Sequence, residues 1–169
     1  MSSLQEYIKE LEMHINSKTP LQVKSSGSTG NAKKIEINIV ERFNKCKIKQ
    51  ADEDYKVGFF YDLGSWASIS VLIFCIKNGL TPKHLTYSSK TIDKIHHICI
   101  SPTQMLYLSQ TKKVYNLCEQ VTLGGEYSTQ KHIEAARKTF PNAKITHVYA
   151  TTETGDICAA SDCKEGFPQ

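Results

Sequence analysis

Residues 121–149 read VTLGGEYSTQKHIEAARKTFPNAKITHVY and contain a strand, a helix and a second strand in direct succession. The first strand ends at two glycines, Ser128 or Thr129 can cap a helix that extends to Phe140, and 145–149 form the second strand. Strands that are joined by a helix normally lie parallel in one sheet. This stretch therefore favours an α/β fold.

The same alternation of strands and helices extends over most of the chain. An apolar stripe at helical spacing predicts a helix near the N-terminus, from Leu4 to Ile15. Further strands are predicted at 21–25, 35–37, 56–61, 84–87, 98–101 and 157–160, and further helices at 38–50, 66–78, 91–97 and 102–109. We expect a three-layer α/β/α domain with a largely parallel sheet. It is a single domain, 1–169, with an N-terminal helix in 1–20 and a ligand-binding core in 21–169.

The composition and charge exclude several classes of protein. Hydrophobic residues make up 40% of the chain and charged residues 22%, as in ordinary globular proteins. The net charge is only +4 and the lysines are scattered among acidic residues, which favours a solvated surface over a nucleic-acid site. No apolar run is long enough to cross a membrane, and the N-terminus carries charges where a signal peptide is apolar. We therefore expect a cytoplasmic protein with neither a membrane nor a nucleic-acid partner.

In α/β sheets, ligands bind on the loops that follow the strands, and three such loops carry polar side chains. The first is SSGSTGNAKK at 25–34. Its glycines let the backbone approach a ligand, and successive N–H groups in such a turn can form an anion-binding concavity. Four hydroxyls and two lysines add donors and positive charge, which suits a polyphosphate. It is not a P-loop, because it leads into a strand, and a plain surface turn is the alternative.

The other two loops follow the strands of the opening stretch. Gly124 and Gly125 leave the backbone bare, so that a flat group can lie against it, although a tight turn explains them as well. In the second loop, Tyr149 could stack on a base, Thr152 could donate to a phosphate, and Glu153 could hold Mg²⁺, which prefers oxygen ligands. A core aromatic and a solvated surface acid are the alternatives for the tyrosine and the glutamate.

Taken together and in this order, the three loops resemble the motifs of adenylate-forming enzymes: acyl- and aryl-CoA ligases, peptide synthetase adenylation domains and luciferases. Ser25–Lys33 is similar to their phosphate loop, Gly124–Glu126 to their adenine-side loop, and Tyr149–Glu153 to their Tyr-Gly-x-Thr-Glu motif. Ser101–Thr103 and Gly166–Pro168 resemble two further segments of the family. The resemblance covers most of the chain after its first twenty residues.

The resemblance implies the ATP- and AMP-binding core of a ligase that activates a small carboxylic acid as acyl-AMP, with CoA or a phosphopantetheine carrier as the acceptor. Thr152, Glu153 and Lys33 would serve catalysis, and Glu153 and Thr29 would hold Mg²⁺. The residues that would contact the nucleotide are Ser25, Ser26, Gly27, Ser28, Thr29, Gly30, Lys33, Gly124, Gly125, Glu126, Tyr149 and Thr152.

Other positions bear on the acid substrate. By resemblance, Asp62 and Trp66 would line the acyl pocket, and a core position is the alternative for Trp66. His147 and Ala150 stand where the family usually has Asn and Gly, and Ala32 stands where it has Pro. These departures leave the phosphate and metal roles intact but leave the class of acid open.

The family also has an aspartate that binds the ribose, and a small C-terminal domain with a catalytic lysine, beyond the region matched here. The chain therefore resembles a truncated form of the family's large N-terminal domain. We expect a C-terminal domain or a separate chain to supply the lysine, and an uncovered edge or apolar patch to permit self-association. The alternative is a non-catalytic nucleotide-binding or scaffolding module that has lost turnover.

Overall fold

The computed structural model describes residues 3–25, 33–52, 54–152, 155–162 and 164–167. In this part of the chain, six strands form one sheet in the order β4-β3-β5-β6-β7-β8, and two form a separate ribbon. The strands are β1 Leu21–Ser25, β2 Lys33–Ile37, β3 Lys56–Phe59, β4 Thr81–His84, β5 His97–Ile100, β6 Gln120–Leu123, β7 Lys144–Thr151 and β8 Gly155–Ala160. The strands from β4 to β7 are parallel, and β8 is antiparallel to β7.

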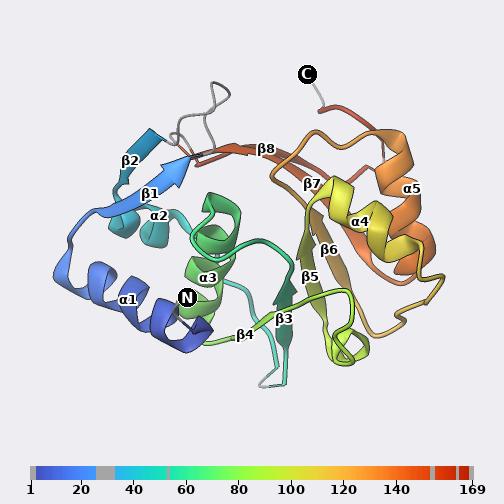
Figure 1. Cartoon of the computed structure of the whole chain (residues 1–169), viewed down its shortest axis with the longest axis horizontal. Helices are drawn as coiled ribbons and strands as arrows, with labels where there is room; N and C mark the ends of the chain where they lie inside the picture. Colours follow the sequence, from blue (N-terminus) through green and yellow to red (C-terminus); the bar gives the residue numbers. More distant parts are fainter. Residues whose placement is uncertain (1–2, 26–32, 53, 153–154, 163, 168–169) are drawn as a thin grey trace.

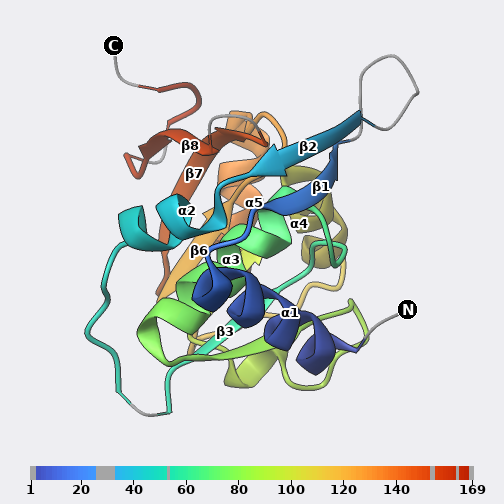
Figure 2. The ribbon, with the colours of Figure 1, turned by 90° about the vertical axis from the view of Figure 1, so that its left-hand side faces the viewer.

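Helices cover both faces of the six-stranded sheet (Figure 1). On one face lies α3, with α1 and α2 packed outside it, and on the other face lie α4 and α5 (Figure 2). The helices are α1 Leu4–Ser17, α2 Ile39–Lys45, α3 Trp66–Asn78, α4 Pro102–Ser109 and α5 Gln130–Thr139, with a 3-10 turn at Ile92–Lys94. The predicted three-layer domain with a largely parallel sheet is therefore confirmed. Within the described ranges, no helix has the length and apolarity that a membrane span requires.

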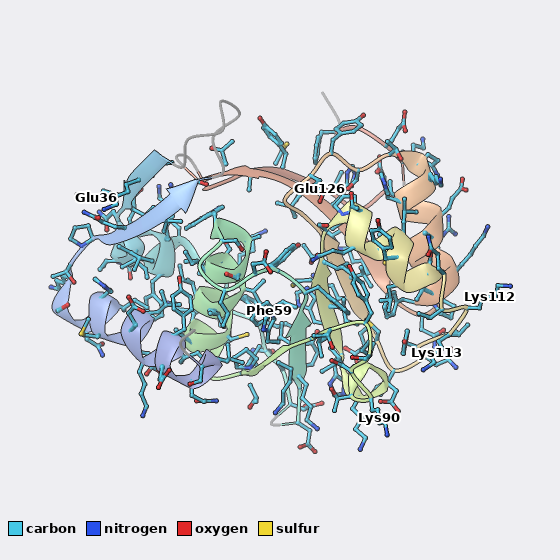
Figure 3. All side chains as sticks on the ribbon, in the orientation of Figure 1. Glu36, Phe59, Lys90, Lys112, Lys113 and Glu126 are labelled. Carbon is cyan, nitrogen blue, oxygen red and sulfur yellow. The ribbon has the colours of Figure 1, made fainter. Side chains whose placement is uncertain are left out.

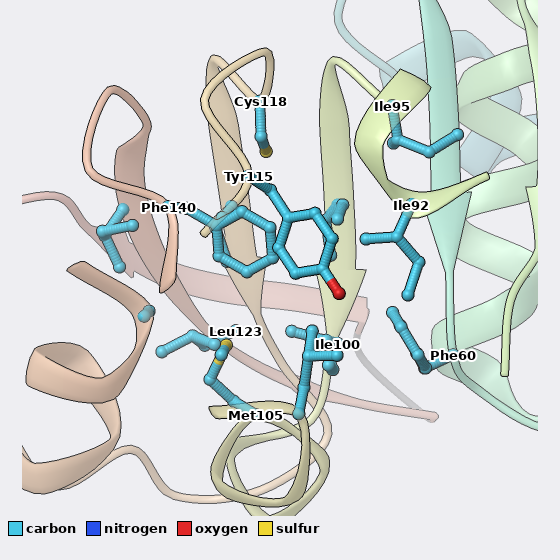
Figure 4. Packing of buried hydrophobic residues seen from close by; sticks show 14 of the residues in the cluster. Phe60, Ile92, Ile95, Ile100, Met105, Tyr115, Cys118, Leu123 and Phe140 are labelled. Atoms are coloured by element: carbon cyan, nitrogen blue, oxygen red, sulfur yellow. The ribbon is translucent and has the colours of Figure 1, made fainter. Parts of the chain in front are cut away.

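A hydrophobic core lies on each face of the sheet. The alternation along β5 separates the two, because Ile98 and Ile100 belong to the core under α4 and α5, whereas Cys99 belongs to the core under α3. Figure 4 shows the first core, in which the rings of Tyr115 and Phe140 stack with centroids 5.4 Å apart. Two buried faces explain why β3 and β5 are short, largely apolar runs, whereas β6 alternates, with Val121 and Leu123 buried.

Serine side chains begin three of the helices. Ser3, Ser65 and Ser101 each accept a hydrogen bond from the backbone N–H three residues ahead, at the starts of α1, α3 and α4. In α4 the bond is reciprocal, because the Gln104 side chain accepts the Ser101 N–H at 3.1 Å. The same Gln104 amide donates to the Phe60 carbonyl at 3.0 Å, which fixes the start of α4 beside the end of β3.

Some predicted elements are wrong in extent or in place. The strand predicted at 84–87 lies instead at Thr81–His84, where it forms β4 at the edge of the sheet. It is mostly exposed and contains Pro82, so its sequence lacks the apolar alternation typical of a strand. The helix predicted at 38–50 begins as expected, with the Asn38 side chain accepting the Glu41 N–H at 3.1 Å, but it ends at Lys45. The loop at 25–34 leads into strand β2 as predicted. However, β1 pairs with β2 in the separate ribbon rather than within the six-stranded sheet.

Candidate functional site

The two glycines after β6 lie at the carboxyl-terminal edge of the parallel strands. The Gly124 N–H donates to the Ile100 carbonyl of β5 at 3.2 Å, and the Tyr61 hydroxyl lies 3.5 Å from the Gly124 carbonyl that it donates to. Gly125 has a φ of 84°, which lies in the left-handed region that residues other than glycine rarely adopt. The loop is thus held from two neighbouring strand ends, and its backbone is bare at two consecutive positions.

Glu126 joins this loop to the start of α4 (Figure 3). Its carboxylate accepts a hydrogen bond from the Thr103 hydroxyl at 2.5 Å and from the Thr103 backbone N–H at 3.2 Å. Burial alone would raise the pKa of Glu126, but hydrogen bonds from Thr103 and Ser101 outweigh it and hold the pKa below its usual value. The Gly-Gly-Glu segment and the Ser101–Thr103 segment therefore form one hydrogen-bonded unit. Both segments were identified from the sequence, but the contact between Thr103 and Glu126 was not predicted.

The neighbouring strand β7 contributes an aromatic group. Leu123 at the end of β6 pairs with His147, which places the outer end of β7 beside the glycine loop. Tyr149 is 51% exposed, so it is not a core aromatic, and its ring centroid lies 6.4 Å from that of Phe167. His147 is buried and its imidazole stacks on Phe167, with centroids 4.7 Å apart and planes inclined by 18°.

His147 places a polar imidazole ring in a buried position. Its Nε2 atom is buried and has no hydrogen-bond partner among the described residues. Burial lowers the pKa of the imidazole, against a smaller opposing effect of Asp162. The ring is therefore neutral at pH 7. The sequence reasoning noted His147 only as a departure from a family pattern and gave Phe167 no role, because the contact joins residues twenty positions apart.

The remaining predicted site residues are only partly described. Thr152 follows β7 and is half-buried, whereas Glu153 lies outside the described residues. Of the first loop, Ser26, Gly27, Ser28, Thr29 and Gly30 also lie outside them. Ser25 ends β1 and Lys33 begins β2, and the two form a register pair across the ribbon. In the described ranges, no group of three or more histidine, cysteine, aspartate or glutamate side chains could hold a metal ion.

Asp62 and Trp66 lie between β3 and α3. Asp62 is exposed, and its carbonyl accepts the Ser65 N–H at 3.1 Å in the turn before α3. Trp66 is half-buried, and the Arg42 guanidinium of α2 lies 5.5 Å from its ring centroid. A packing role therefore accounts for at least part of the Trp66 side chain.

The segment between these two residues borders an open cleft of about 450 Å³. The cleft lies between α1, β1 and the turn before α3, and is lined by Tyr7, Glu10, Leu21, Gln22, Val23, Leu63, Gly64 and Ser65. Burial, with a smaller contribution from Glu10, raises the pKa of Tyr7 to about 12. The cleft thus offers a neutral phenol and a carboxylate beside the predicted acyl-pocket residues.

The fold of this chain recurs in adenylate-forming enzymes of known structure. It superposes on the complex of VinN with L-aspartate with a TM-score of 0.68, at 15% identity, over 85% of this chain and 40% of that one. A double mutant of the o-succinylbenzoate CoA synthetase MenE from Bacillus subtilis, bound to a product analogue, superposes with a TM-score of 0.66 at 19% identity. The match covers 83% of this chain and 31% of the MenE chain.

The Klebsiella oxytoca NpsA N-terminal subdomain, in complex with 3-hydroxybenzoyl-AMSN, superposes with a TM-score of 0.66 at 15% identity. The match covers 87% of this chain and 41% of the NpsA chain. The chain thus spans less than half the length of these structures. No protein-family model and no curated protein sequence matches it. At these identities the likeness establishes the fold, which is that of part of the large N-terminal domain of adenylate-forming ligases.

Proposed function

We propose that this chain is the ATP- and AMP-binding core of an adenylate-forming ligase. The observation that carries the proposal is the carboxyl-terminal edge of the sheet, where a bare glycine loop tied to α4 through Glu126 lies beside the half-exposed Tyr149. A flat base can lie against a backbone without side chains and stack on a phenol ring. The same fold in enzymes solved with acyl-AMP analogues supports the same use of this edge.

The reaction that fits is the activation of a carboxylic acid. A carboxylate oxygen bonds to the α-phosphorus of ATP, the bond from that phosphorus to the oxygen bridging the β-phosphate breaks, and pyrophosphate leaves with the electron pair. Ser25–Gly30 would donate hydrogen bonds to the pyrophosphate, and Lys33 would offset its charge. Thr152 would donate to the α-phosphate. Transfer of the acyl group to the thiol of CoA or of a phosphopantetheine carrier would follow.

Mg²⁺ would be held chiefly by the phosphates, with Glu153 and Thr29 completing its oxygen shell. This fits the way magnesium is bound at nucleotide sites, where one or two side chains suffice. The ion would offset phosphate charge, while the protein positions the reacting oxygen and excludes water.

Calorimetric titration with AMP and with Mg-ATP tests the proposal. We expect both to bind, and the double variant Thr29→Ala with Lys33→Ala to weaken ATP binding at least tenfold while changing AMP binding little. Lys131→Ala on α5 serves as the control for loss of positive charge.

Glu153→Gln should reduce the magnesium dependence of ATP binding. Absence of binding to the intact chain at any magnesium concentration would contradict the proposal. Binding without turnover, even when a lysine-bearing C-terminal domain is supplied in trans, would favour a non-catalytic module.

A further inference from the structure

The segment from Lys164 to Phe167 packs across the same edge of the sheet, near the upper end of α5 in Figure 1. The Glu165 carboxylate accepts the backbone N–H of Gln130, the first residue of α5, at 2.9 Å. Gly166 then turns the chain with a φ of 85° and directs Phe167 onto β7. This segment is therefore attached at two points, by a carboxylate at a helix N-terminus and by an aromatic ring.

The Phe167 ring lies against two ring-bearing residues of β7, His147 and Tyr149. It stacks in parallel on His147 at 4.7 Å and is tilted against Tyr149 at 6.4 Å. Tyr149 is the residue that the proposed function assigns to base stacking. Stacked rings in proteins have centroids about 4.5–7 Å apart, so a base between His147 and Phe167 would need roughly twice the separation observed. A base and the Phe167 ring therefore cannot occupy the face of His147 together.

We propose that Phe167 occupies the base position of the nucleotide site and must swing aside before the nucleotide binds. The inference rests on the proposed function and adds to it a residue that sets nucleotide affinity. Glu165 tethers the segment by accepting the Gln130 N–H, which lies in the first turn of α5 and has no acceptor within the helix, so that this bond can break without unfolding α5. Because the apparent affinity falls in proportion to the fraction of molecules with the site open, removing the ring should strengthen binding.

Titration of AMP into the intact chain and into Phe167→Ala tests the inference. We expect the variant to bind AMP about threefold to tenfold more tightly, the range that the loss of one or two aromatic contacts gives. Glu165→Gln keeps the shape but weakens the tether, and should strengthen binding by a smaller factor. Tyr107→Ala, an exposed aromatic residue on α4, should leave the affinity unchanged.

A second measurement does not depend on the nucleotide. In the absence of ligand, the NMR signals of the His147 ring should move when Phe167 is replaced, because the stacked ring is lost. Unmoved signals would overturn the inference. Equal or weaker AMP binding by Phe167→Ala would overturn it while leaving the proposed function intact, whereas no binding by either protein would overturn both.

Discussion

At the scale of single residues, the candidate site depends on a few backbone and hydrogen-bonding constraints. Gly125 and Glu126 lie next to each other after β6, yet they act in different ways. The glycine permits a backbone conformation that other residues avoid, and the glutamate ties the loop to another helix. Substitutions at the two positions should therefore have separable effects.

Gly125→Ala should destabilise the protein more than Gly124→Ala. A side chain at Gly125 would be forced into the left-handed region, which costs about 1–2 kcal/mol. A Cβ at Gly124 would lie 3.3 Å from the Tyr61 hydroxyl, a contact that a small shift of that ring relieves. Urea unfolding of both variants measures the difference, and equal losses of stability would contradict the conformation assigned to Gly125.

Glu126→Gln should lower the stability in a manner that depends on pH. The folded-state pKa of Glu126 is depressed, so its contribution is present above the unfolded-state carboxyl pKa of about 4.3 and is lost as the pH falls through the folded-state value. Because the carboxylate is exposed to solvent, we expect the substitution to lower the free energy of unfolding by only about 0.5–1 kcal/mol at pH 7. The difference from the native protein should shrink steadily as the pH is lowered from 7 and should vanish once Glu126 is protonated in the folded protein. Glu134→Gln on α5 is the control. A difference that persists there would show that ionisation is not the cause.

At the scale of elements, the sequence predicted best those helices whose apolar runs end or begin at a glycine or a proline. The bounds of α3 and α4 agree with the prediction because Gly79 marks the end of α3 and Pro102 marks the start of α4. The edge strand β4 was misplaced because an exposed strand has no buried face to impose alternation. The Tyr61–Gly124 and Phe167–His147 contacts could not be predicted, since each depends on the order of strands in the sheet rather than on local pattern.

The start of α4 gives a test at this scale. Gln104 completes the capping box with Ser101 and also donates to the Phe60 carbonyl, so Gln104→Ala removes two hydrogen bonds between partly buried groups. We expect a loss of about 1–2 kcal/mol in the free energy of unfolding. Gln110→Ala, at the other end of the same helix, should cost less than half of that. If both variants lose the same stability, the link between α4 and β3 is not an anchor.

At the scale of the whole molecule, the strand ends bring together groups that are distant in the sequence. The glycine loop, Thr103 and Tyr149 come from three parallel strands or the residues that follow them, which is where ligands bind in such sheets. The sequence predicted this grouping for the second and third loops because both follow strands that are neighbours in the chain. The side chains of the first loop remain a prediction, since Ser26–Gly30 lie outside the described residues.

The attack of a carboxylate on the α-phosphorus brings two anions together, so the full reaction needs a cation close to the developing charge. In the proposed site, Lys33 would be engaged by the pyrophosphate, and the Glu126 side chain beside Gly125 adds a carboxylate. Closure of another domain would supply the cation and exclude water from the reactive acyl-AMP. We therefore expect residues 1–169 to bind nucleotide but to activate acids very slowly when alone.

Acid-dependent exchange between pyrophosphate and ATP measures this directly, across a panel of aliphatic and aryl acids. The chain alone should give exchange at least a hundredfold slower than the chain supplied with a lysine-bearing C-terminal domain in trans. Replacing that lysine by alanine in the added domain is the matched control and should return the rate to that of the chain alone. Rapid exchange by residues 1–169 without any addition would show that the cation comes from within this chain, and Lys33→Ala would then identify whether the phosphate loop provides it.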